Sequence, residues 1–180
     1  MRTILVIFIL FVTSAKANDL VWHKGSVVLN TKEVVIGDLA RQGFDLLLLR
    51  NSKGIVSVYP AHKISSFRYY DEEENINRAF VVIADRHYER VASGRISVFR
   101  IQKTFDQKMN EKDPDAYEYF VEEHKIVRSL KSFRRKYFDK IKEELDLRLI
   151  PHDHLDPNTK HGALSLILLY NKSENVLSSI

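Results

Sequence analysis

Short apolar runs separated by polar turn residues fill the chain between positions 20 and 102. Runs rich in Val, Ile, Leu, Phe and Tyr, and broken by Gly, Asn, Asp and Ser, are typical of antiparallel strands. We expect at least seven strands among residues 27–29, 34–36, 44–49, 55–59, 63–69, 78–84, 88–92 and 95–102. The turn residues recur at intervals suited to antiparallel pairing. This segment is therefore predicted to be a β-meander that closes on itself as a small barrel or sandwich.

The hydrophobic period changes in the last third of the chain. A polar loop over 103–116 precedes a predicted hairpin of residues 117–121 and 126–130, which extends the same sheet. A second helix is predicted from about Asp156 onward, with Ala163, Leu164, Ile167, Leu168 and Tyr170 as its apolar residues. Before it, apolar residues that recur every four positions predict an amphipathic helix with Ser132 as its N-cap; they are Phe133, Tyr137, Ile141 and Leu145.

These elements predict an α+β fold. Residues 18–130 form an antiparallel β-domain, and residues 131–180 form a helical segment that packs on the sheet. The mature chain is long enough for one domain with a substantial core.

The apolar run at residues 4–12 follows a charged start and precedes Ala15-Lys16-Ala17. This arrangement is typical of a cleavable export signal, whereas a membrane-spanning helix needs about 20 apolar residues. We expect residues 1–17 to be a signal peptide and the mature protein to be periplasmic or secreted, with no transmembrane segment. An uncleaved anchor or a buried first helix is the alternative.

Charge and cysteine content narrow the classes of partner. The net charge of +4 falls to +2 when the signal removes Arg2 and Lys16, an excess too small to indicate a nucleic-acid partner. The chain has no cysteine, which excludes disulfides, a thiol nucleophile and a thiolate metal site. Burial of apolar surface must therefore stabilise the fold.

Motifs of known enzymes are missing from the sequence. It contains no Gly-x-Ser-x-Gly, no His-Glu-x-x-His, no Gly-rich phosphate loop and no calcium loop, so we expect no cofactor and favour a non-enzymatic role. The alternative is a metal-dependent hydrolase using His152, His154 and His161, since three imidazoles could leave a fourth tetrahedral position for water. The favoured interpretation of this stretch is a polar connector between the two helices, bracketed by Pro151 and Pro157.

A basic cluster lies at the start of the first predicted helix, made of Arg128, Lys131, Arg134, Arg135, Lys136 and Lys140. Residues 134–136 are predicted in the first helical turn, where the helix dipole disfavours cations, so an anionic partner would account for them. The other interpretation is a solvated helix face whose charges are balanced by Asp139, Glu143 and Glu144.

Four segments together resemble a group of uncharacterised exported β-rich proteins of Gram-negative bacteria: Trp22–Leu29, Pro60–Phe67, Gly94–Arg100 and Tyr117–Val121, followed by a basic helix and a terminal Leu-Leu-Tyr-Asn. The resemblance spans about residues 20–172 and implies the fold and the compartment, but no catalytic residues. We expect an exported binding or structural module that contacts a protein or an anionic envelope component, such as lipid headgroups or a polysaccharide.

Overall fold

The computed structural model describes residues 20–104, 107 and 116–177, with side chains placed up to residue 174. The predicted signal peptide, residues 1–17, lies outside the described residues. Its cleavage and the export that it implies therefore stay predictions.

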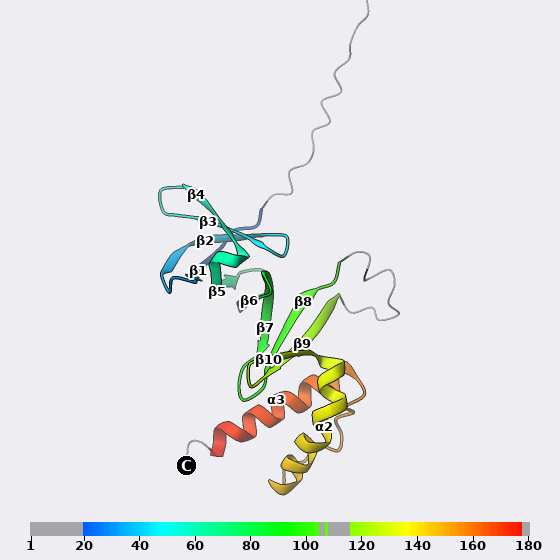
Figure 1. Ribbon diagram of the computed structural model, residues 1–180. Helices are drawn as coiled ribbons and strands as arrows, with labels where there is room; N and C mark the ends of the chain where they lie inside the picture. Colours follow the sequence, from blue (N-terminus) through cyan, green and yellow to red (C-terminus); the bar gives the residue numbers. More distant parts are fainter. Residues whose placement is uncertain (1–19, 105–106, 108–115, 178–180) are drawn as a thin grey trace, which may run out of the picture.

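The described residues form one antiparallel sheet of ten strands followed by two helices, which confirms the α+β fold (Figure 1). The strand order is β10-β9-β8-β7-β6-β5-β1-β2-β3-β4, so the first strand lies in the middle of the sheet. The strands are β1 (His23–Leu29), β2 (Val34–Gln42), β3 (Leu46–Arg50), β4 (Val56–Pro60), β5 (Ile64–Asp71), β6 (Ile76–Ile83), β7 (Arg86–Ala92), β8 (Ser97–Gln102), β9 (Tyr117–Glu123) and β10 (Ile126–Ser129). A 3₁₀ turn, η1 (Ala61–Lys63), connects β4 and β5.

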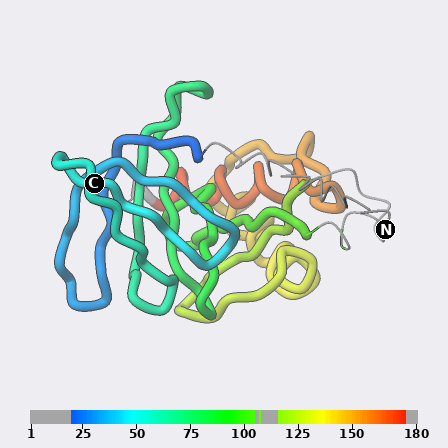
Figure 2. Tube along the Cα trace, turned by 90° about the horizontal axis from the view of Figure 1, so that it is seen from above, coloured from blue at the N-terminus to red at the C-terminus, as the bar shows by residue number. Residues whose placement is uncertain are grey.

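The sheet curls but does not close, so the predicted closure of the meander on itself is wrong. Strands β10 and β4 are its two edges. The N-terminal strands bend round toward the middle of the sheet (Figure 2), and the backbone N–H of His87 in β7 donates to the carbonyl of Phe44 at 2.7 Å. Strands β8 to β10 are covered by the two helices, so this half of the sheet is buried without closure into a barrel.

Two apolar cores lie on this sheet. The first joins β1, β2, β3, β5 and β6, and the rings of Phe67 and Phe80 stack in it with centroids 4.6 Å apart. The second joins β8 and β9 to both helices through Val98, Val121 and Phe133. In this second core, both helices pack against the sheet.

Helix α2 (Leu130–Leu147) begins earlier than predicted. Its N-cap is Ser129, whose hydroxyl accepts a hydrogen bond from the N–H of Ser132 at 3.3 Å, and Leu130 is helical rather than the end of a strand. The predicted apolar stripe is confirmed: Phe133, Ile141 and Leu145 are buried, and Tyr137 is partly buried.

Helix α3 (Lys160–Leu177) is capped by Thr159, whose hydroxyl accepts from the N–H of Gly162 at 3.0 Å. Gly162 lies so close to the preceding loop that a Cβ atom would stand 2.0 Å from the Asp156 carbonyl oxygen. Ala163, Ile167 and Tyr170 are buried and Leu164 is partly buried, as the pattern predicted, whereas Leu168 is 49% exposed. In the described part of the chain, neither helix has the length and apolarity needed to cross a membrane.

Candidate functional site

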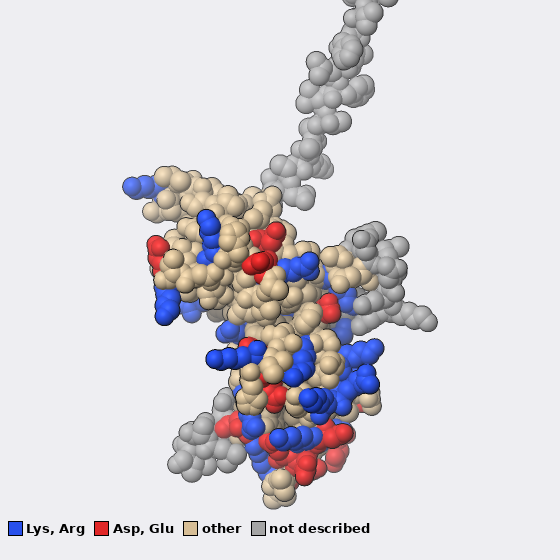
Figure 3. Space-filling view, in the orientation of Figure 1, with Lys and Arg blue, Asp and Glu red and all other residues tan. Residues whose placement is uncertain are grey.

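We call Arg128, Lys131, Arg134, Arg135, Lys136 and Lys140 the basic surface. The structure places all of these residues at the end of β10 or in the first eleven residues of α2. Lys131, Arg135, Lys136 and Lys140 are exposed. Lys and Arg side chains gather where β9, β10 and α2 meet, and Asp and Glu side chains gather toward the far end of α2 (Figure 3).

The charges on α2 run against its helix dipole. With Ser129 as the N-cap, Lys131 occupies the first turn and residues 134–136 follow in the second, one turn later than predicted. The first turn holds no acidic residue, and the last turn holds no basic one. A cation near a helix N-terminus costs about 0.3–1 kcal/mol at an exposed position. The stability of the helix therefore does not explain the basic surface.

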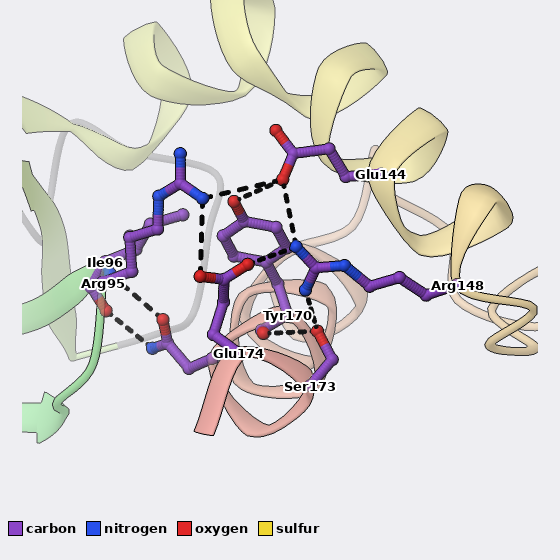
Figure 4. A network of polar contacts seen from close by, with 8 residues as sticks. Arg95, Ile96, Glu144, Arg148, Tyr170, Ser173 and Glu174 are labelled. Carbon is purple, nitrogen blue, oxygen red and sulfur yellow. Dashed lines mark hydrogen bonds and ion pairs between the residues drawn. The ribbon is translucent and has the colours of Figure 1, made fainter. Parts of the chain in front are cut away.

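Among the described residues, the acidic side chains of α2 form no direct ion pair with the exposed cations of the basic surface. Glu144 instead faces α3, where it accepts a hydrogen bond from the Tyr170 hydroxyl at 2.7 Å and lies 3.5 Å from the Arg148 guanidinium (Figure 4). Lys131, Arg135 and Lys140 form no ion pair with any residue that the structure describes. The predicted balance by Glu144 is therefore not observed.

The two partly buried arginines of the basic surface are held by contacts within the fold. Arg134 donates from Nη1 to the carbonyl of Asn158 at 2.7 Å, which ties α2 to the connector before α3. The Arg128 guanidinium lies 5.5 Å from the centroid of the Tyr137 ring. These contacts fix both cations in place near the exposed ones.

Two hollows flank Lys131. The first has a volume of about 410 Å³ and lies between the ends of β8 and β9 and the first turns of both helices, where Lys103, Lys131, Arg134 and Lys160 line it beside Glu118. The second has a volume of about 400 Å³, and Ser129, Lys131, Ser132, Arg135 and Lys136 line it. Guanidinium, ammonium and backbone N–H groups at a helix N-terminus together bind phosphate or carboxylate.

Sequence reasoning missed the contribution of Lys103, Glu118 and Lys160 to the first hollow. Lys103 follows the end of β8, Glu118 lies in β9 and Lys160 begins α3, so none of them belongs to the helix that carries Lys131. No spacing rule connects them, because the contact depends on how α2 and α3 pack against the sheet.

The three histidines proposed as metal ligands are not gathered into a site. His152 is 4% exposed, and its Nδ1 lies 3.0 Å from the carbonyl oxygen of Ile150, whereas His154 and His161 are exposed. Over the described ranges, no group of three or more His, Cys, Asp or Glu side chains is arranged to hold a metal ion. His152 instead shapes the connector between the helices.

Comparison of the chain with protein-family models, with curated proteins and with solved structures finds no match. The functional interpretation therefore depends on the geometry of the described residues.

Proposed function

We propose that this protein is an exported, non-enzymatic binding module whose basic surface contacts the phosphate groups of anionic lipid headgroups in the cell envelope. The observation that carries the proposal is the set of exposed cations at the N-terminal end of α2, which form no ion pair with the described residues and are placed against the helix dipole. Cations at this end of α2 lower the stability of the helix, so their presence is better explained by the binding of an anionic partner.

The shape of the basic surface favours headgroups over a polysaccharide chain. Its cations lie at the end of β10 and in the first eleven residues of α2, and two separate hollows lie beside Lys131. Each hollow, at about 400 Å³, has room for one headgroup. A polymer would instead call for a continuous groove.

The expected affinity is modest. Each Lys or Arg near an anionic membrane contributes about 1 kcal/mol. The cations of the basic surface together would give about 6 kcal/mol, which corresponds to a dissociation constant between millimolar and micromolar. Because exposed charges are screened by salt, binding should weaken steeply as ionic strength rises.

Vesicle co-sedimentation of residues 18–180 tests the proposal. We expect binding to vesicles that contain phosphatidylglycerol, no binding to pure phosphatidylcholine, and loss of binding at high salt. The double substitution Lys131→Glu and Arg135→Glu should abolish binding. Lys53→Glu with Lys63→Glu makes the same change in charge at exposed positions far from α2, and should leave binding intact.

Two results would contradict the proposal. One is equal binding by the wild type and the Lys131→Glu, Arg135→Glu variant. The other is retention on an acidic polysaccharide such as alginate without any binding to vesicles.

A further inference from the structure

A second polar region lies between the two cores and away from the basic surface. It is a cleft of about 200 Å³, here called the central cleft, and its lining includes Arg41, Tyr69, Phe80, His87, Glu89 and Arg100. Phe80, Glu89 and Arg100 are direct partners on neighbouring strands, so their side chains share one face of the sheet. Arg41 comes from β2 on the curled part of the sheet.

His87 is the most unusual residue of the central cleft. Its side chain is 1% exposed, and neither ring nitrogen has a hydrogen-bond partner among the described residues. Its ring meets Phe67 edge-on, with centroids 4.9 Å apart. A buried polar group without a partner costs free energy, and native proteins rarely retain one.

The protonation state of His87 defines what it can bind. Burial, together with the nearby Arg41 guanidinium, lowers the pKa of the His87 imidazole to about 4, while Asp45 acts weakly in the opposite direction. The ring is therefore neutral at pH 7, with one nitrogen that donates a hydrogen bond and one that accepts.

Arg41 is the cation of the central cleft that lacks a counter-ion. Arg78 pairs with Asp71, Glu74 and Glu89, each at 2.7 Å, and Arg100 pairs with Glu89 at 2.8 Å. Arg41 forms no ion pair with the acidic residues that the structure describes, and its buried Nε atom has no hydrogen-bond partner there. Its guanidinium instead lies 4.6 Å from the centroid of the Phe80 ring.

We propose that the central cleft binds a small organic monocarboxylate, whose carboxylate pairs with Arg41 and hydrogen-bonds to His87. Arg41 has no acidic partner in direct contact among the described residues, and its planar guanidinium fork fits a carboxylate. A cavity of about 150 Å³ holds benzene, so the volume of the central cleft admits a ring-sized body with a carboxylate attached. This site does not depend on the basic surface.

Benzoate and benzamide provide a matched pair of probes, because they have nearly the same shape and differ in charge. The full chain, labelled with ¹⁵N, is titrated with each probe and with acetate, while the ring nitrogens of His87 are followed by NMR. We expect saturable shifts with benzoate and at least tenfold weaker binding of benzamide. Equal binding of the two, or no response of His87 to either acid, would overturn the proposal and leave ordered water as the partner of His87.

Substitutions locate the site. Arg41→Met keeps the length of the side chain but removes its charge, and should weaken benzoate binding at least tenfold. Arg86→Met, at an exposed position in β7, is the control and should change nothing. If Arg41→Met does not fold, the comparison of benzoate with benzamide on the wild type still decides the question.

The two proposals fail independently. The Lys131→Glu, Arg135→Glu variant should lose vesicle binding and keep its response to benzoate. Loss of the benzoate response in that variant would contradict a separate site in the central cleft.

Discussion

Burial of His87 should make the fold sensitive to mild acid. In the unfolded chain the imidazole has its ordinary pKa of 6.5, whereas in the folded protein burial and Arg41 lower the pKa to about 4. Between these values the unfolded chain binds a proton that the folded protein does not. Stability is therefore lost as pH falls from about 6.5 toward 4. The charged groups that line the cleft around the ring are Arg41, Arg78, Arg100, Asp71 and Glu89.

The magnitude follows from the difference between the two pKa values. A separation of about 2.5 pKa units corresponds to about 3 kcal/mol when the transition is complete, at about 1.36 kcal/mol per unit. Between pH 7 and pH 5 the expected loss is about 2 kcal/mol. Most carboxylates titrate below this window, so the effect of His87 can be measured there with little interference.

Urea unfolding at pH 7, 6 and 5 measures the loss directly. His87→Leu removes the imidazole and should flatten the dependence on pH over this range. It should also raise the free energy of unfolding at pH 7 by about 1–3 kcal/mol, since two buried atoms without partners are removed. His154→Leu removes an exposed imidazole and should leave the dependence unchanged. Equal losses in the wild type and in His87→Leu would refute the reasoning.

Three other substitutions test the packing of the helices and the charges of α2. Gly162→Ala should lower the free energy of unfolding, measured in urea, by about 1–3 kcal/mol, because the new Cβ would stand 2.0 Å from the Asp156 carbonyl oxygen. Unchanged stability would contradict this contact. Asn171→Ala should lower the free energy of unfolding, measured by thermal unfolding, by about 2–4 kcal/mol, because the Asn171 side-chain amide hydrogen-bonds to both the N–H and the carbonyl of Ile96, at 3.0 and 2.7 Å. A decrease below about 0.5 kcal/mol would argue against this role. Lys131→Glu replaces a cation by an anion in the first turn of α2, so it should raise the free energy of unfolding by about 1 kcal/mol while weakening vesicle binding. A lower free energy of unfolding would exclude an effect of the helix dipole.

Local patterns predicted the elements well where one face of an element is buried. The four-residue recurrence in α2 is a property of the helix itself, so the burial of Phe133, Ile141 and Leu145 could be read from their spacing. The N-cap was misplaced because Ser129 and Ser132 are equally suitable residues. Which of them ends the strand depends on where β10 stops pairing with β9.

The two candidate sites differ in how far apart their residues lie in the sequence. The basic surface could be predicted because its residues are close in the sequence, at the end of β10 and the start of α2. The central cleft could not, since Arg41 and His87 come from strands that neither follow one another nor pair in the sheet. They line one cleft because the sheet curls, which brings the backbone N–H of His87 within 2.7 Å of the carbonyl of Phe44.

Residue types and their spacing determined the strands, the two amphipathic helices, the absence of disulfides and the position of the basic cluster. Tertiary structure alone decided that β1 inserts between β5 and β2, that the sheet curls without closing, and that His87 is buried beside Arg41, which has no acidic partner among the described residues. The physical reason is that backbone hydrogen bonds between antiparallel strands are the same for any pair of neighbours. The choice of neighbours is settled by the packing of side chains from distant parts of the chain.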